Sequence, residues 1–275
     1  MEETKNFEID YFSGLGYKSR GLHRHDFSEL LFVLEGKLNF LVDDKLYKAD
    51  RNCVILFKEK RLHTSEVDAS SVYTRYNLNF RRKFINETAD YEKIKGCFDS
   101  DCTVLPLDEK QSTQLKSLFD TMLENHNIIE TDKYAEEICR HILTAILMYV
   151  SRVAENVPLS ERLYIDRSYI SDAVKYINDH LTEKLVIEDI ADSLFVSRAK
   201  LIGDFKNSTG ITIGDYITSQ RLKKAKKLLS SGVEVGKSAT ESGFMNTCHF
   251  IRTFKKYNGI TPLQYAHSSK KKIQN

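Results

Sequence analysis

The chain has 275 residues, of which 41% are hydrophobic and 29% charged, and this predicts two domains with separate cores. The first residues are polar, and the longest apolar run, residues 142–150, is about half the length needed to cross a bilayer. We therefore expect a cytoplasmic protein without a membrane partner. The five cysteines are scattered and form no CxxC pair, so neither a disulfide framework nor a zinc ribbon is indicated.

The net charge of +2 hides two parts of opposite sign. Residues 1–165 carry 23 Lys and Arg against 28 Asp and Glu, whereas residues 166–275 carry 18 against 11. A basic module joined to an acidic one indicates a polyanionic partner for the second module only.

The N-terminal part shows short apolar runs separated by turn residues. The expected strands are residues 29–35, 37–42, 45–49, 54–57 and 71–80. Glu35-Gly36 and Asp43-Asp44 stand between consecutive runs, where hairpin turns need residues that tolerate positive φ or bond locally. Closely spaced strands of this kind predict an antiparallel sandwich or small barrel.

After Arg81 the apolar period becomes helical, and helices are expected over residues 108–125 and 132–153. The second helix has a broad apolar stripe, which consists of Ile138, Ile142, Ala145, Ile146, Tyr149 and Val150. This stripe either covers the barrel or pairs with a second copy of the chain. Residues 156–167 are the expected linker between a domain of residues 1–155 and one of residues 168–275.

The C-terminal module is predicted to contain two helix-turn-helix units. A helix capped by Ser168 precedes the first unit, in which residues 186–194 lead into a helix capped by Ser197. The second unit pairs residues 235–242 with residues 246–258. A long helix over residues 212–231 joins the units, and we expect its basic face to contact DNA phosphates; this face holds Arg221, Lys223, Lys224, Lys226 and Lys227.

These motifs resemble the AraC/XylS family of bacterial transcription regulators over nearly all of residues 168–267. The matching blocks are L-x3-F-K-x3-G at 201–210, Tyr216-Ile217, Arg221-Leu222, Ala225, Gly243-Phe244, His249-Phe250, Phe254-Lys255-Lys256, Gly259-Ile260-Thr261-Pro262 and Tyr265. Ser238 and Ala266 depart from the isoleucine and arginine that are usual there. The resemblance implies two recognition helices that enter successive major-groove segments of bent promoter DNA.

The second helix of a helix-turn-helix meets DNA with its N-terminal turn, and the resemblance implies which positions of both helices face the bases; basic residues later on the second unit's helix are added as candidates. The candidates are Ser197, Arg198, Ala199, Lys200, Ile202 and Gly203 in the first unit, and Asn246, Thr247, His249, Arg252, Lys255 and Lys256 in the second. Arg252 can bond guanine bidentately, whereas the first helix offers mainly Arg198. We therefore expect the second unit to contribute more of the hydrogen-bonded base readout.

A second constellation lies near the N-terminus. His23, His25 and Glu29, followed by Gly36 and later by His63, resemble the first cupin motif and the histidine of the second. In cupin enzymes these three histidines and the carboxylate bind a divalent metal, and imidazole with carboxylate suits zinc, iron, manganese or nickel. The glycine and proline positions of the second motif are replaced, at or near Asn52 and Glu59.

The resemblance implies that sensor domains of this family commonly keep such histidines without a metal. We therefore expect no cofactor and no bound metal, and interpret these residues as polar lining of a small-molecule pocket or as hydrogen-bonding groups within the barrel. The ligand-binding candidates are Arg20, His23, His25, Glu29, His63 and Arg75. The alternative is a catalytic, sensing or structural metal at His23, His25, Glu29 and His63.

The sequence thus predicts an α+β protein of two domains, an N-terminal cupin-like antiparallel β-barrel with a helical hairpin and a C-terminal all-α domain with two helix-turn-helix units. The expected function is transcription regulation under a small-molecule effector, by resemblance often a sugar, and not catalysis. The expected partners are double-stranded promoter DNA, the effector, a second copy of the chain and RNA polymerase. The alternatives are a cupin metalloenzyme with a DNA-binding tail and a barrel that only dimerises.

Overall fold

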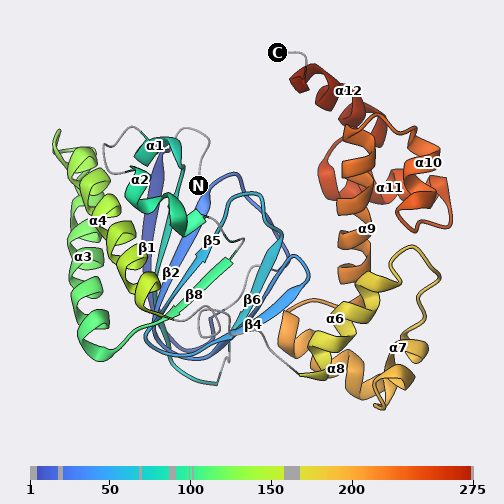
Figure 1. Ribbon diagram of the computed structural model, residues 1–275, viewed down its shortest axis with the longest axis horizontal. Coiled ribbons are helices and arrows are strands. Elements are labelled where there is room, and N and C mark those ends of the chain that lie inside the picture. Colours follow the sequence, from blue (N-terminus) through green and yellow to red (C-terminus); the bar gives the residue numbers. More distant parts are fainter. Residues whose placement is uncertain are drawn as a thin grey trace. The chain divides into compact units, whose positions relative to one another are not determined.

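The computed structural model describes residues 5–17, 21–67, 70–86, 91–98, 100, 102–157 and 168–273. The chain divides into two compact units, Met1–Asp166 and Arg167–Asn275 (Figure 1). Arg20 and residues 158–167 of the expected linker lie outside the described residues. The predicted fold class, a β-sheet domain followed by a helical domain, is confirmed.

Two antiparallel sheets form the framework of the first unit. The described strands are β1 (Phe7–Gly14), β2 (Ser28–Glu35), β3 (Leu38–Val42), β4 (Lys45–Ala49), β5 (Cys53–Phe57), β6 (His63–Val67), β7 (Tyr73–Phe80) and β8 (Cys102–Pro106). Their order is β1-β7-β2-β5-β8 in the larger sheet and β4-β3-β6 in the smaller. Gly36 and Asp43, in the two expected turns, have the positive φ that tight hairpins require.

The five strands expected from the sequence are present, and three more were missed. β6 is too polar to show an apolar pattern, and β8 is a five-residue run that follows the change to helical period. β1 pairs with β7, and β8 pairs with β5, so both edges of the larger sheet come from distant segments. Such pairing leaves no local signal in the chain.

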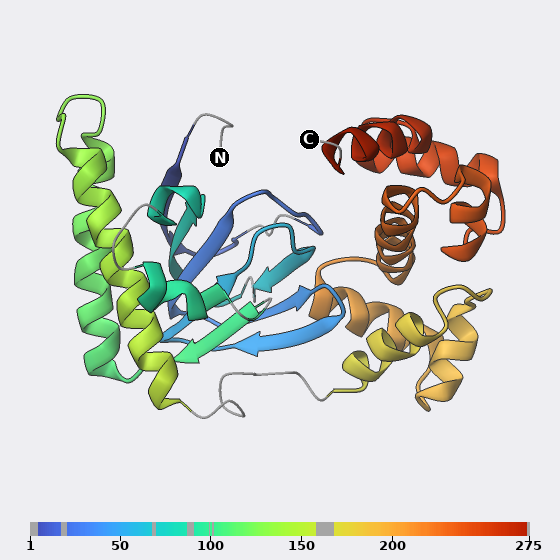
Figure 2. The ribbon, with the colours of Figure 1, turned by 45° about the horizontal axis from the view of Figure 1, so that its top comes forward.

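Helices cover one face of the five-stranded sheet (Figures 1 and 2). They are α1 (Lys83–Asn86), α2 (Tyr91–Ile94), the 3-10 helix η1 (Lys95–Phe98), α3 (Glu109–Asn127) and α4 (Ala135–Asn156). The apolar stripe of α4 is divided, because Ile146 and Val150 pack in the core while Ile138 stays exposed and Ala145 is half-buried. Among the described residues, no helix is long and apolar enough to span a membrane.

The other face of the larger sheet lies against the smaller sheet. Along β7, Tyr76, Leu78 and Phe80 belong to the core under the helices, whereas Tyr73 belongs to the core between the sheets. Because side chains alternate along a strand, Arg75, Asn77 and Asn79 share the inner face with Tyr73. The interior between the sheets therefore receives a row of polar side chains.

The second unit consists of helices only. They are α6 (Tyr169–Asp179), α7 (Ile187–Ser193), α8 (Arg198–Thr209), α9 (Ile213–Ser230), α10 (Val235–Glu241), α11 (Thr247–Asn258) and α12 (Pro262–Ile273). The N-terminal part of α9 packs on α8 through Tyr216 and Phe205, and its C-terminal part contributes Leu222, Ala225 and Leu229 to the core around α10–α12. One helix therefore belongs to both cores.

Candidate functional site

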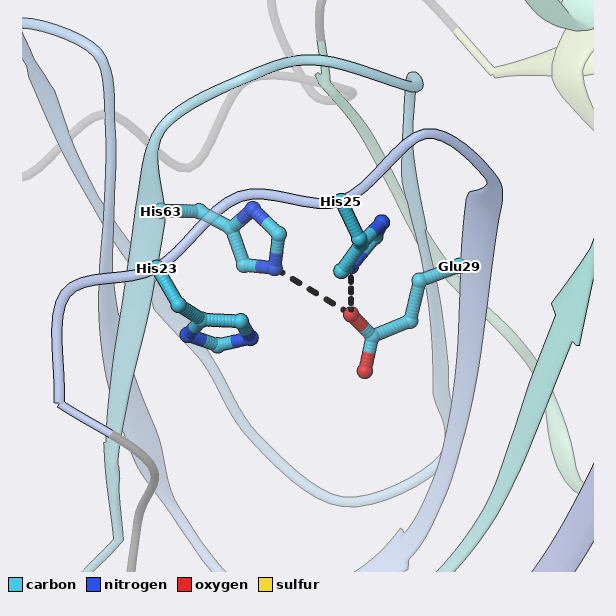
Figure 3. A group of neighbouring side chains, drawn as sticks. All are labelled: His23, His25, Glu29 and His63. Atoms are coloured by element: carbon cyan, nitrogen blue, oxygen red, sulfur yellow. Dashed lines mark hydrogen bonds and ion pairs between the residues drawn. The ribbon is translucent and has the colours of Figure 1, made fainter. Parts of the chain in front are cut away.

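Four of the predicted ligand-binding residues lie together in the N-terminal unit (Figure 3). Glu29 is on β2 of the larger sheet, His63 begins β6 of the smaller sheet, and His23 and His25 lie on the segment before β2. One nitrogen from each ring and one carboxylate oxygen all lie within 4.8 Å of one another. We call this group the histidine–glutamate cluster.

The backbone and two aromatic rings hold these side chains in place. His23 and His63 form an antiparallel bridge with two N–H···O bonds of 2.9 Å, which fixes the loop against β6. Phe27 stacks on His25, with ring centroids 3.8 Å apart, and Phe57 stacks on His63 at 4.7 Å. The rings can therefore rotate little, so their nitrogens keep a common direction.

Glu29 is the central acceptor of the cluster. His25 Nε2 lies 3.0 Å and His63 Nε2 lies 3.2 Å from the same oxygen, Oε2. Burial alone would raise the pKa of the Glu29 carboxyl, but the hydrogen bonds and charges of these two rings outweigh it and hold that pKa well below its usual value. Burial lowers the pKa of His23. The cluster therefore presents a buried carboxylate among imidazoles.

Arg75 lies apart from the cluster on the same inner face. It sits opposite Val33, and Asn79 sits opposite Glu29, so Arg75 is four residues or about 13 Å along the strand from the cluster. Its guanidinium bonds to the Asp10 carboxylate and lies 3.4 Å from the Tyr17 hydroxyl.

Sequence reasoning missed Asn77 and Asn79, which connect Arg75 to the cluster. The Oδ1 atoms of both side chains and Nε of Arg75 are buried without a hydrogen-bond partner among the described residues. The signal was the alternation of residues 75–80, which places Asn77 and Asn79 on the same face as the predicted Arg75. Unpaired buried polar atoms are costly, so a site that keeps three of them in a row suits a polar ligand.

In the C-terminal unit, most of the residues predicted to read DNA are exposed on the surface. Ser197 caps α8 by accepting from the Lys200 amide, and Asn246 caps α11 by accepting from the His249 amide. The candidates of the first turn are exposed on both helices, as are Arg252, Lys255 and Lys256; Ile202 is half-buried. Leu201, Phe205, Phe250 and Phe254 are buried and hold the two helices on their cores.

The two helices differ in how their cations are paired. Arg198 Nε lies 2.7 Å from a Glu188 oxygen of α7, and Lys200 Nζ lies 2.7 Å from an Asp204 oxygen. On α11, His249 meets Thr253 at 3.4 Å, whereas no ion pair of Arg252 or Lys255 occurs within the described residues. Arg198 and Lys200 must therefore break these ion pairs before they can contact a phosphate or a base of DNA.

Arg221 does not belong to the exposed basic face predicted for the long helix. Its guanidinium turns inward and donates to the backbone carbonyls of Leu181 and Glu183, at 3.0 and 2.8 Å. These two hydrogen bonds connect the segment before α7 to α9. Burial lowers the pKa of the Arg221 guanidinium.

Gly243, in the turn of the second helix-turn-helix, lies against the segment before α7, at Leu181. Its φ is +93°, and an added Cβ would lie 2.3 Å from the Leu181 carbonyl oxygen. This close approach joins the turn of the second helix-turn-helix to the first three-helix core.

Two protein-family models match parts of this chain. A family model described as an AraC-like ligand binding domain matches residues 12–141, and a helix-turn-helix domain model matches residues 190–268. The HTH-type transcriptional regulator YdiP of Escherichia coli K12 is 24% identical over 270 residues, which cover 91% of this chain and 82% of that protein. The HTH-type transcriptional regulator YfiF of Bacillus subtilis 168 is 22% identical over 273 residues, covering 95% and 83%.

Among solved structures, ToxT from Vibrio cholerae O395 matches 95% of this chain and 97% of its own, with 14% identity and a TM-score of 0.37. The matched relatives are regulators, which confirms the expectation of a regulator rather than an enzyme.

The substitution Gly243→Ala is expected to lower the free energy of unfolding of the C-terminal unit by about 3 kcal/mol, because it adds a clash with the Leu181 carbonyl to the strain of a positive φ. Gly259→Ala is the matched control, since Gly259 has φ +74° and no atom within 4 Å of the added Cβ, so about 1 to 2 kcal/mol is expected. Chemical denaturation followed by the helical circular dichroism signal measures both. Equal losses would show that the close approach contributes nothing.

Proposed function

Because this chain belongs to the AraC/XylS family of transcription regulators, we propose that α8 and α11 read promoter DNA while a small molecule held between the two sheets controls that binding. The observation that supports the DNA part most strongly is the repeated geometry of the two helices. Each is capped at its first turn, anchored by two buried residues and exposed along its predicted reading face. Such helices present their N-terminal residues to the major groove.

The two helices have unequal roles in this proposal. Because Glu188 and Asp204 partly neutralise α8, its cations contribute less to base recognition than those of α11. Arg252 on α11 reads a base, whereas Lys255 and Lys256, in the last turn, contact phosphates.

The protein acts where promoter DNA lies, in the cytoplasm, and changes transcription through RNA polymerase, since a regulator on a promoter acts by altering polymerase recruitment or passage.

Arg252→Ala is expected to relax one position of the preferred sequence and to lower affinity for that sequence by about 1 to 3 kcal/mol, because a bidentate arginine–guanine contact is lost. The wild-type chain first selects its preferred site from a random DNA pool, and fluorescence anisotropy then compares selected and random duplexes. Lys256→Ala is the control and should weaken both duplexes alike. If Arg252→Ala also weakened both alike, Arg252 would be a phosphate contact.

The effector site of this proposal comprises the histidine–glutamate cluster, the row Arg75, Asn77 and Asn79, and Arg20, which lies outside the described residues. Two amide oxygens of the row need donors, and the Arg75 Nε–H needs an acceptor. Hydroxyl groups supply both, and Asp10 already neutralises Arg75. An uncharged molecule with several hydroxyl groups, such as a sugar, therefore suits the row.

Asn79→Leu is expected to stabilise the N-terminal unit by about 1 kcal/mol while abolishing its response to the effector, because it removes an unpaired buried amide oxygen that the ligand would satisfy. The measurement is the melting temperature of the full chain across a panel of sugars and polyols. Asn39→Leu, half-buried on β3, is the control and should keep the response. A ligand that shifted wild type and Asn79→Leu equally would exclude this row as its site.

We also propose that the chain forms a homodimer through the outer face of α3 and α4. A groove of about 570 Å³ lies there, and its lining residues are Lys93, Leu118, Ala145, Met148, Tyr149, Ser151, Arg152 and Glu155. Its apolar part suits an identical surface, and Arg152 with Glu155 allows opposite charges to meet across a twofold axis. Ile146 and Val150 pack against the sheet instead and take no part.

Ala145→Arg should weaken this dimer by about 2 kcal/mol or more, because a long charged side chain would replace a small one in the groove. Sedimentation velocity over a concentration series measures the change. The control is Glu124→Lys, at an exposed position of α3 that does not line the groove. A dimer that survives Ala145→Arg unchanged would place the interface elsewhere.

A further inference from the structure

Phe195, in the turn between α7 and α8, combines a costly backbone conformation with an exposed side chain. Its φ is +56°, and the residue is 96% exposed. The Phe195 N–H donates to the Asp192 carbonyl, and the Val196 N–H donates to the Ala191 carbonyl, at 3.1 Å each, which is the Schellman ending of a helix. Glycine is the usual residue at this left-handed position, because a residue with a Cβ atom is strained there.

The second helix-turn-helix makes the same turn with glycine. The Gly243 N–H donates to the Thr240 carbonyl at 3.0 Å, and Phe244 bonds in the same way to Ala239. The aromatic residue of this turn, Phe244, is 5% exposed and packs in the core around α10–α12. Phe244 therefore stabilises the fold, whereas Phe195 adds strain without burying its ring. A costly feature of this kind indicates a contact outside the chain.

Helix α7, which ends at this turn, is acidic. It contains Glu188, Asp189 and Asp192 and no Lys or Arg, although residues 166–275 carry 18 Lys and Arg against 11 Asp and Glu. Asp189 and Asp192 are exposed, while Glu188 pairs with Arg198. Carboxylates repel the phosphates of DNA, so this surface suits a positively charged protein rather than DNA itself.

We propose that Phe195, Asp189 and Asp192 form a docking surface for RNA polymerase on the same promoter. The inference rests on the proposed function, in which α8 lies in the major groove. The leading helix of a helix-turn-helix crosses the DNA backbone, so the turn before α8 stays beside the DNA, within reach of a protein bound to the adjacent segment. A polymerase needs a basic surface to hold DNA, and lysine or arginine side chains of that surface can pair with the two aspartates.

Phe195 is the anchor of this docking surface. An aromatic ring that enters an apolar recess of a partner contributes most when a polar rim around it excludes water, and the two aspartates supply such a rim. The Schellman hydrogen bonds hold the backbone of the turn before any partner arrives. The ring is therefore presented in a fixed place, and less conformational entropy is lost on docking.

The test uses the full-length chain and duplexes that carry its selected site at a series of spacings upstream of a core promoter. Mobility shift measures the affinity of RNA polymerase holoenzyme from the same bacterium for each duplex, with and without the chain. Wild type should raise that affinity about tenfold or more at one spacing at least. Phe195→Gly and Asp192→Lys should reduce the gain to about twofold or less. Met245→Ala, exposed in the turn before α11, is the matched control and should keep the gain.

Binding of the selected duplex alone and thermal melting are measured for every variant. Phe195→Gly should bind that duplex as wild type does and melt no lower, because glycine relieves the strain of the turn. Phe195→Asn, which also tolerates a left-handed backbone, is the second variant and should behave in the same way.

A wild-type gain that survives Phe195→Gly overturns the inference, as does the absence of a gain at every spacing. Weaker binding of the selected duplex by folded Phe195→Gly also overturns it, since the ring would then contact DNA. A wild-type chain that binds its selected duplex but does not help the polymerase refutes this inference alone. A wild-type chain that prefers no duplex refutes the proposed function.

Discussion

The N-terminal unit depends on one constraint, that the five-stranded sheet has to bury both of its faces. Helices α3 and α4 cover one face with an ordinary apolar core. The three-stranded sheet covers the other face, and there apolar residues pack around a row of polar ones. Because strand alternation sends every second residue inward, the same strand β7 supplies core residues to the helices and Arg75, Asn77 and Asn79 to the interior. The proposed effector site therefore lies on the face of the sheet opposite the one that the helices cover.

The C-terminal unit follows a different rule, since its two small cores share a single helix. Neither helix-turn-helix is large enough to bury much apolar surface alone, and α9 contributes to both. Arg221 and Gly243 add a direct connection between the segment before α7 and the turn before α11. The relative placement of the reading helices α8 and α11 thus depends on backbone contacts that are remote from any DNA-facing side chain. In the function we propose, specificity resides in the side chains, where Glu188 and Asp204 partly neutralise the cations of α8 and α11 is the principal reader.

Much of this could be predicted from local pattern. The helices of residues 168–275, the cap at Ser197 and the turns at Gly36 and Asp43 follow from short-range preferences that act in any tertiary context. The edge strands β1 and β8 could not be placed, because they are defined by partners many residues away. Arg221 was interpreted as a phosphate contact from its place on a basic helix, yet its side chain reaches buried carbonyls that only the folded unit brings near.

The sequence by itself determined that this chain is a two-part regulator, because helix-turn-helix periodicity, caps and charge are encoded within a few residues of one another. It also identified His23, His25, Glu29 and His63 as a chemically related set. Tertiary structure alone decided that these four meet, that each ring directs Nε2 toward the others, and that Asn77 and Asn79 extend the polar row toward Arg75. The physical reason is that ring orientation and unsatisfied polar atoms arise from contacts between two sheets, and no local pattern records them.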